Sequence, residues 1–458
     1  MLIKNAEIYQ RGLGDLRLVE GSVAEIGTLS PETDEPVIDA NGGALLPGLN
    51  DHHIHFLSYA AALVSMDCSP TAAANATDLK RLLGAQSSGA HWLRGFGYHE
   101  SVAGDIDRHW LDRHGPKRPI RIQHRSGRLW ILNSKALDIV NNLLMERDSN
   151  IELNPESLAS GRFYDSDQVL SELIGRNLPP VELASNKLAS YGVTGFSDMT
   201  PTNKGETFAL FADLMQQRKI SQNVQLAAKD PAICGGHEGN LVKIHLHENR
   251  LPELDQLIAR IKASHHLSVP VAIHCVTEIE LMFSLGALEE AGTIQGDRIE
   301  HASITPEHTL SRIQDMGLIV VTQPGFIAEK GDTYLDDLEQ DYHPQLYRCK
   351  SFLDQNIGLA ASSDAPFGSA DPWQAMRAAV QRKTRSGRAV GEAESISPEQ
   401  ALSMYLGSLM EPHHPRQIEP GCTADLCLMA HPWSQIKLRL TSSDVSRVFR
   451  AGKVIFQR

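Results

Sequence analysis

The chain has 458 residues, with 43 Lys and Arg against 56 Asp and Glu, so its formal net charge is −13. At roughly 100–200 residues per domain, this length corresponds to two to four domains or to one large barrel with an appendage. The shares of hydrophobic (41%) and charged (22%) residues are typical of a globular protein and exclude a disordered or fibrous chain. An acidic chain without a long run of Lys or Arg is a poor candidate for binding nucleic acid or an anionic membrane.

The start of the chain and its cysteines predict where the protein resides. No apolar stretch approaches the roughly 20 residues that span a bilayer. Residues 1–7 lack the basic start and apolar run of a signal peptide. The six cysteines are scattered and include no Cys-x-x-Cys pair, which argues against a zinc knuckle and a disulfide framework. We therefore expect a cytoplasmic protein with reduced thiols.

Short strands are predicted at both ends of the chain. The candidates, which alternate with period two or read as a hairpin and are separated by turn residues, are residues 1–10, 16–20, 22–27, 424–430, 445–449 and 453–456. Strands at the two ends of a chain can pair with one another. We expect a small β-sandwich domain composed of residues 1–46 and 412–458.

Between the two ends, short apolar strands alternate with helical stretches. The eight strand candidates are residues 44–50, 192–199, 223–228, 241–246, 271–276, 298–302, 318–323 and 359–363. Helical stretches such as residues 254–264 and 278–291 separate the later strands. This alternation is typical of a parallel sheet with crossover helices. Eight such units predict an α/β fold, a (β/α)8 TIM barrel over residues 47–411.

A long insertion separates the first barrel strand from the second. About 140 residues lie between the two strands, and they contain strand-like and helical pieces of their own. Connections of this length are seldom structureless, and a lid over an active site is a common use for them. We therefore expect residues from about 63 to 180 to form an insertion that covers the active site.

Metal-binding residue types stand at the ends of five predicted barrel strands. The first strand continues through His53 and His55, which are two residues apart and therefore lie on one face. The fourth strand contains Lys243, and the fifth, sixth and eighth strands end in His274, His301 and Asp364. Barrel enzymes carry their active sites at the C-terminal ends of the strands. The pattern predicts a metal site at the mouth of the barrel.

Several motifs occur in the same order as these strands. They are residues 47–55 (PGLNDHHIH), 133–137 (NSKAL), 192–195 (GVTG), 273–274 (IH), 298–301 (RIEH), 362–366 (SSDAP) and 418–426 (IEPGCTADL). On these motifs, which span essentially the whole chain, the sequence resembles the amidohydrolase superfamily. Within it, the sequence is similar to amidohydrolase family 3, the branch that contains N-substituted formamide deformylases.

This resemblance implies a metal-dependent hydrolase that cleaves a C–N bond of a small molecule, such as an amide, a formamide or a carbamate. The attacking group would be a metal-bound hydroxide, with Asp364 as general base and acid. One or two divalent cations are implied, zinc ahead of cobalt, manganese, iron or nickel. A homo-oligomer, either a dimer or a tetramer, is also implied. We expect no nucleic acid or membrane partner.

The resemblance also assigns the ligands residue by residue. His53, His55 and Asp364 would hold one cation. His274 and His301 would hold a second cation, which would polarise the scissile carbonyl, so that His301 is counted with Asp364 as catalytic. Lys243, if carboxylated by carbon dioxide, would bridge the two cations, because a carbamate supplies two oxygens and a negative charge.

Departures from the family pattern leave alternatives open. His245 and His247 alternate with Lys243 and could replace or supplement it, which would give a single-metal site. Arg128 stands where relatives commonly have the histidine of Asp-Gly-His, and it could bind a substrate carboxylate or be structural. Three other residues could contact substrate or be structural, namely Tyr98, His99 and Gln323.

Two other functions remain as alternatives. A hydrolytic deaminase of a small heterocycle, with a mononuclear site, usually carries His-x-x-Glu at the fifth strand, whereas Glu278 here lies one position too far from His274. A non-catalytic barrel scaffold predicts eroded ligands, whereas all six expected ligand positions are occupied by suitable residues. We rank both alternatives behind C–N hydrolysis.

Overall fold

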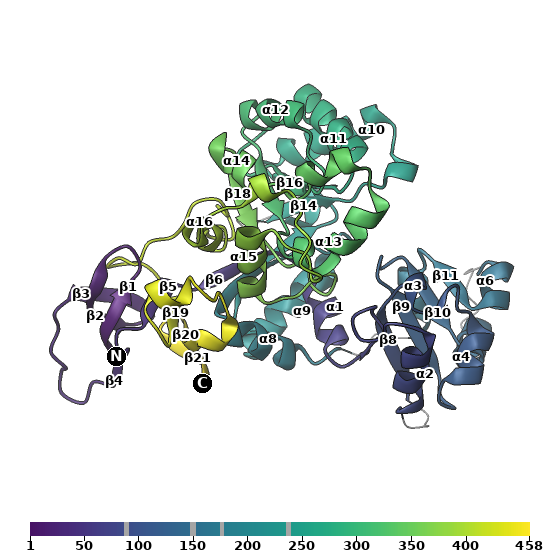
Figure 1. Cartoon of the computed structure of the whole chain (residues 1–458), viewed down its shortest axis with the longest axis horizontal. Helices are drawn as coiled ribbons and strands as arrows, with labels where there is room; N and C mark the ends of the chain where they lie inside the picture. Colours follow the sequence, from purple (N-terminus) through teal and green to yellow (C-terminus); the bar gives the residue numbers. More distant parts are fainter. Residues whose placement is uncertain (87–90, 147–152, 175–177, 235–239) are drawn as a thin grey trace. The chain divides into compact units, whose positions relative to one another are not determined.

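The computed structural model describes residues 1–86, 91–146, 153–174, 178–234 and 240–458 (Figure 1). The chain divides into two compact units. One contains Met1–Phe56 together with Glu182–Arg458, and the other is Leu57–Val181. The first unit holds the barrel and the strands from both chain ends. The second unit overlaps the predicted insertion, and the insertion's bounds of about 63 to 180 stay a prediction.

The first unit contains a parallel sheet of eight strands that follow one another in sequence, the TIM-barrel-like arrangement that was predicted. The strands are β6 (Leu49–Ile54), β12 (Val193–Asp198), β13 (Asn223–Ala228), β14 (Leu241–Ile244), β15 (Val271–Cys275), β16 (Arg298–His301), β17 (Ile319–Thr322) and β18 (Gly358–Ala361). The residues after β18 return to β6, because the Asp364 amide donates to the His53 carbonyl (2.8 Å) and the His55 amide to the Ala365 carbonyl (2.9 Å). These bonds bring the first and last strands together where their carboxyl ends lie.

The first predicted strand, residues 44–50, is divided between two sheets, and this corrects the prediction. Residues Ala44–Pro47 form β5 of a different sheet, and β6 of the barrel begins at Leu49. Gly48 lies between them, and a Cβ atom there would lie 2.3 Å from the side chain of Thr194. Only glycine fits where the chain passes this closely. The barrel strand then continues to Ile54, so that His53 lies inside it.

Strands from both chain ends form one sheet, as expected. In spatial order they are β21 (Lys453–Gln457), β20 (Val445–Arg450), β19 (Leu426–Met429), β5 (Ala44–Pro47), β1 (Leu2–Ile8), β2 (Gly12–Val19) and β3 (Ser22–Gly27), with β4 (Val37–Asp39) paired to β1. Residues from both ends, such as Ile3, Leu45 and Phe449, are buried in one apolar core. Because the strands form a single hydrogen-bonded path, a sandwich of two sheets is not confirmed.

Helices surround the barrel strands (Figure 1). They are α8 (Val181–Ser190), α9 (Gly205–Gln216), α10 (Leu254–His266), α11 (Glu278–Ala291), α12 (Leu310–Asp315), α13 (Gly325–Asp337), α14 (Lys350–Asp354), α15 (Pro372–Gln381) and α16 (Pro398–Ser403), with α17 (Trp433–Ile436) near the C-terminus. The start of α11 is fixed by a capping box, in which Thr277 and Glu280 accept one another's backbone N–H bonds (both 3.2 Å). Glu280 also accepts from the amides of Val276 (2.8 Å) and Glu248 (2.9 Å), so it fixes the segments that follow β15 and β14.

The second unit has its own sheet and core. Its strands, in spatial order, are β11 (Arg162–Tyr164), β10 (Leu129–Leu132), β9 (Ile120–His124), β8 (Leu93–Tyr98) and β7 (Met66–Asp67). Its helices are α1 (Phe56–Ala62), α2 (Ala76–Gly84), α3 (Glu100–Ala103), α4 (Arg108–His114), α5 (Ser134–Glu146), α6 (Pro155–Ser160) and α7 (Asp167–Ile174). Strands β7, β8 and β9 are parallel, and β9, β10 and β11 are antiparallel. That this unit covers the active site stays a prediction.

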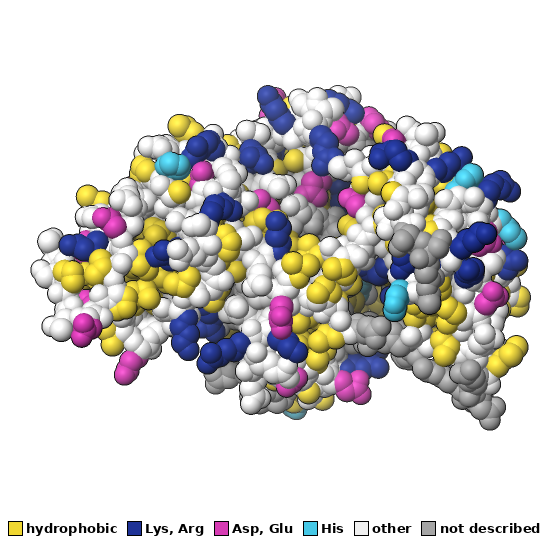
Figure 2. Space-filling view, turned by 90° about the horizontal axis from the view of Figure 1, so that it is seen from below, with side chains coloured by type: hydrophobic (Ala, Val, Ile, Leu, Met, Phe, Trp, Pro, Cys, Tyr) yellow, Lys and Arg dark blue, Asp and Glu magenta, His cyan; other side chains and the backbone are white. Residues whose placement is uncertain are grey.

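Three further features bear on the expected location and partners. Within the part of the chain that the structure describes, none of the helices combines the length and the apolar character of a membrane-spanning helix. All six cysteines are free thiols. On the face of the molecule that Figure 2 shows, acidic and basic side chains lie interspersed. The cytoplasmic location and the absence of nucleic acid and membrane partners stay predictions.

Candidate active site

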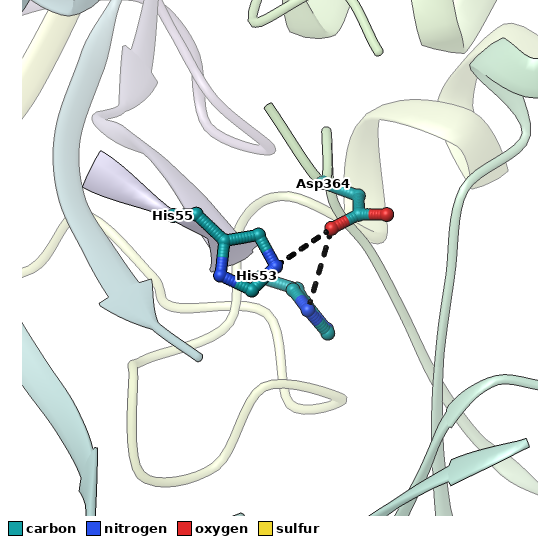
Figure 3. Close-up of side chains that lie close together, drawn as sticks. All are labelled: His53, His55 and Asp364. Atoms are coloured by element: carbon teal, nitrogen blue, oxygen red, sulfur yellow. Dashed lines mark ion pairs between the residues drawn. The ribbon is translucent and has the colours of Figure 1, made fainter. Parts of the chain in front are cut away.

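Three of the predicted ligands meet at the carboxyl ends of β6 and β18. The Oδ1 atom of Asp364 lies 3.2 Å from Nε2 of His55 and 3.5 Å from Nε2 of His53 (Figure 3). The three ligand atoms all lie within 4.8 Å of one another. His53 and Asp364 are buried, and His55 is half-buried. We call these three residues the barrel triad.

In both imidazole rings of the barrel triad, the Nδ1 atom contacts a polar side chain. Nδ1 of His53 lies 2.5 Å from Oε2 of Glu300, and Nδ1 of His55 lies 3.1 Å from the hydroxyl of Thr200. The Glu300 carboxylate accepts a hydrogen bond from Nδ1–H, so the lone pair of His53 is at Nε2, which faces Asp364. This carboxylate–histidine arrangement is common behind metal-ligating histidines.

Glu300 and Arg298 lie behind His53, and sequence reasoning did not single them out as site residues. Nε of Arg298 lies 2.6 Å from Oε1 of Glu300, and both side chains are fully buried. Strand alternation puts Glu300 and His301 on opposite faces. The backbone of His301 has φ 71°, and that of Ala302 has φ 47°, so the chain departs from the strand at this point. The motif RIEH contained Glu300, but the conformation that brings both side chains to the site cannot be seen in it.

The other predicted ligands, Lys243, His274 and His301, belong to strands β14, β15 and β16. The His301 ring lies 4.8 Å from that of His53 and 4.5 Å from that of His274, between ring centres. Burial lowers the pKa of His274 well below its usual value. Lys243 of β14 is buried, and its Nζ atom has no hydrogen-bond partner among the described residues. Thus histidines and a lysine from three successive strands extend the site beyond the barrel triad.

Two further histidines follow Lys243 and were predicted, from strand alternation, as alternative ligands. Strand β14 ends at Ile244, so His245 and His247 lie beyond the strand. The His245 ring lies 4.3 Å from the His274 ring and 4.4 Å from the His247 ring, between ring centres. His245 is exposed, whereas Lys243 is buried. The structure therefore places His245 beside a predicted ligand, and the choice between it and Lys243 stays open.

Electrostatics keep the buried imidazoles and the carboxylate in the form that binds metals. Burial lowers the pKa of His53 and of His301, so both imidazoles stay neutral at neutral pH. Burial also lowers the pKa of Lys243 to about 8. For Asp364, burial by itself raises the pKa, but the close contact with His55 and the charge of His53 lower it below the usual value. The site therefore combines neutral imidazoles with an ionised carboxylate.

The residues present fit a divalent cation. Three buried atoms, Nε2 of His53, Oδ1 of Asp364 and Nζ of Lys243, have no hydrogen-bond partner among the described residues. Leaving such atoms unpaired costs free energy, which a bound cation would offset. A tetrahedral cation about 2.0–2.2 Å from its ligands holds them about 3.4 Å apart. The separations of 3.2 and 3.5 Å in the barrel triad match this value.

The four predicted substrate contacts are engaged within the protein. Gln323, after β17, is 2.8 Å from Nδ1 of His301 and donates to Ser362 (2.9 Å), so it orients His301. Tyr98 is buried in the core of the second unit and donates to the Gly104 carbonyl (2.6 Å). Arg128 forms two bonds to Asp165 (2.7 and 2.6 Å). His99 lies with Glu100 and His124 in the second unit. Contact of these four residues with substrate stays a prediction.

This chain is similar to several known proteins. A model of the amidohydrolase family matches residues 36–456. The N-substituted formamide deformylase of Arthrobacter pascens is 24% identical, over 84% of this chain and 82% of that protein. A crystal structure of an uncharacterized metal-dependent hydrolase from Pyrococcus horikoshii OT3 has a TM-score of 0.74 at 20% identity, over 94% of this chain and 97% of that one. A second such hydrolase, from Pyrococcus furiosus, has a TM-score of 0.69 at 20% identity, over 93% and 98%.

The family match extends over nearly the whole chain, from the composite sheet through the barrel. The barrel places histidines and an aspartate at its carboxyl edge, where a divalent cation fits. The chain therefore belongs to the amidohydrolase family and is a metal-dependent hydrolase that acts on carbon–nitrogen bonds.

Proposed function

We propose that this hydrolase cleaves the C–N bond of a small amide, formamide or carbamate at the barrel triad. The observation that carries this proposal is the convergence of His53, His55 and Asp364, whose facing atoms lie within 4.8 Å of one another. A formamide is the first substrate to test, because the similar protein from Arthrobacter pascens is named as an N-substituted formamide deformylase.

A divalent cation held by the barrel triad would supply Lewis acidity and lower the pKa of water. Zinc is the first choice, because two imidazoles and a carboxylate suit it. Glu300 and Thr200 keep the two rings oriented for that cation. Their role is to hold Nε2 of each ring toward the barrel mouth.

Asp364 is the proposed proton carrier. Its Oδ1 atom faces both histidines, and its second carboxylate oxygen points away from the two rings (Figure 3). An ionised carboxylate at this place can take a proton from the attacking water. The same carboxyl group can then protonate the leaving nitrogen, so that amine and acid are released.

A second cation is proposed between Lys243, His274 and His301. The buried Lys243 amine, which has no hydrogen-bond partner among the described residues, is suited to carboxylation by carbon dioxide. The resulting carbamate would bridge the two cations with its two oxygens. If Lys243 stays unmodified, His245, whose ring lies 4.3 Å from that of His274, is the replacement ligand and the site is mononuclear.

The test uses the full chain purified without chelator. Metal per chain is measured by elemental analysis, and N-substituted formamides, amides and carbamates are assayed for released amine and acid. We expect bound divalent metal, activity that is lost on chelation and restored by zinc, and inactivity of His53→Ala. The matched control is His266→Ala on the exposed side of α10, which should remain active.

Three outcomes would change the proposal. Activity that survives His53→Ala would exclude the barrel triad as the site. Ammonia release from aminated heterocycles without an acid product would favour the deaminase. A chain that binds no divalent metal after reconstitution would favour the scaffold. Metal content in Lys243→Ala then separates one cation from two, since a bridged pair should fall to one or fewer.

A further inference from the structure

A second group of metal-ligating side chains lies in the insertion unit. Strands β8 and β9 run parallel, and Tyr98 pairs with His124, so the ends of both strands lie together. Nε2 of His124 lies 3.0 Å from Oε2 of Glu100, and Nε2 of His99 lies 3.7 Å from the same oxygen. All three ligand atoms lie within 4.8 Å of one another. We call His99, Glu100 and His124 the insertion trio.

Each imidazole ring of the insertion trio is oriented by a nearby serine hydroxyl. Nδ1 of His99 lies 2.8 Å from the hydroxyl of Ser101, and Nδ1 of His124 lies 2.8 Å from the hydroxyl of Ser126. Each serine follows its histidine by two residues. The contacts turn Nε2 of both rings toward the carboxylate of Glu100. Two imidazole nitrogens and one carboxylate oxygen therefore converge from two strand ends.

The proton positions permit metal binding. Without a cation, the backbone amides of Ser101 (3.3 Å) and Ser126 (3.1 Å) donate to Nδ1, so each neutral ring carries its proton at Nε2 and donates it toward Glu100. When a cation takes the two Nε2 atoms, each ring keeps one proton and moves it to Nδ1. The backbone amides of Ser101 and Ser126 then no longer donate to Nδ1, and the serine hydroxyl beside each ring accepts a hydrogen bond from the Nδ1–H group. No oxidant or other reactant is needed.

The geometry points to a divalent transition-metal site of the zinc type in the insertion unit, formed by His99, Glu100 and His124, none of which belongs to the barrel triad. Ligands of a tetrahedral cation lie about 3.4 Å apart, and the observed 3.0 and 3.7 Å bracket this value. The side chains are 25%, 41% and 14% exposed, respectively, which leaves room for water as the remaining ligand. The bound cation would tie the end of β8 to the end of β9.

The simpler interpretation is an ion pair between Glu100 and His124 that binds nothing. The two interpretations differ in what a glutamine at position 124 does. His124→Gln keeps an N–H donor for Glu100 and so preserves the local contact, but it removes a metal ligand. Loss of metal without loss of folding is therefore the signature of a cation site.

The test measures zinc and cobalt binding to the full chain in a background that carries His53→Ala, His55→Ala and Asp364→Asn. Binding is compared with and without His124→Gln. We expect His124→Gln to bind about one cation fewer per chain and to lose a visible cobalt absorption band. Thermal unfolding of the background variant should shift upward by several degrees with zinc, and the added His124→Gln should abolish that shift.

Two controls keep the result specific. His109→Gln, an exposed histidine of α4, should leave cation number, cobalt band and thermal shift unchanged. Glu100→Gln should weaken zinc binding at least about tenfold, because the carboxylate is the only charged ligand of the insertion trio. Equal metal content with and without His124→Gln would overturn the proposal, as would an equal loss in His109→Gln.

Discussion

The barrel triad and the insertion trio contain the same types of side chain in different surroundings. In the barrel triad, Nδ1 of His53 is taken by Glu300, while the facing Nε2 atom and Oδ1 of Asp364 have no hydrogen-bond partner among the described residues. In the insertion trio, a carboxylate already occupies the facing nitrogens, and the side chains are partly exposed. The comparison teaches that buried, unpaired ligand atoms distinguish a preorganised centre from a group that must first exchange its own contacts.

The largest effect is expected at the carboxylate of the barrel triad. Asp364→Asn removes the proton carrier and a charged ligand, so kcat should fall about 10²–10⁴-fold. The matched control is Asp354→Asn, because Asp354 lies in an exposed pair with Lys350 and should be replaceable without loss. Steady-state kinetics with a formamide substrate measure both. A normal kcat in the Asp364→Asn variant would mean that Asp364 is not the proton carrier. The barrel triad would then not differ from the insertion trio in catalytic role.

A smaller effect is expected from the buried carboxylate behind His53. Glu300→Gln should lower the metal affinity of the barrel about 10–100-fold, because it weakens the contact that orients the ring. Competition with a chromophoric chelator measures this affinity apart from turnover. Glu289→Gln is the control, since Glu289 pairs with Arg312 at the surface. Unchanged affinity in Glu300→Gln would mean that packing alone holds the His53 ring.

Some parts of the fold and of the site could be predicted from the sequence, and others could not. The barrel strands follow apolar runs bounded by turn residues, and predicted strand 22–27 and helix 278–291 coincide with β3 and α11. The change from one sheet to the other at Gly48 was missed because residues 44–50 were predicted as one continuous strand. Glu300 was missed because its position depends on the left-handed backbone of His301. The Arg128 partner, Asp165, lies 37 residues away in sequence, and such a pairing is fixed only by the fold.

A buried histidine beside the barrel triad should make the folded state sensitive to acid. Burial, followed by the charges of Arg298 and Arg416, lowers the pKa of His52 to about 3 from 6.5. Between pH 6.5 and about 3 the unfolded chain therefore carries a proton that the folded chain does not. His52 contributes nothing at pH 7 and reduces the free energy of unfolding by about 1.4 kcal/mol per pH unit as the pH falls below 6.5.

His52→Gln tests this by removing the titrating group. Denaturant unfolding of the barrel unit at pH 6, 5 and 4 should show a shallower loss of stability, by about 1.4 kcal/mol per pH unit, than the unsubstituted chain. His266→Gln should not change the slope, because His266 is exposed. Equal slopes for His52→Gln and the unsubstituted chain would show that His52 titrates normally in the folded state.

The smallest effect is expected at the exposed pair of the insertion unit. The side chains of Arg128 and Asp165 are 42% and 54% exposed, whereas those of Arg298 and Glu300 in the barrel are 2% and 0% exposed. Water and salt screen the exposed pair, so a double-mutant cycle of Arg128→Ala and Asp165→Ala should give a coupling of about 1 kcal/mol or less. The guanidinium is already engaged by Asp165, so Arg128→Ala should change KM for a carboxylate-bearing substrate less than about threefold. A tenfold rise in KM confined to such substrates would instead mean that Arg128 exchanges Asp165 for the substrate carboxylate.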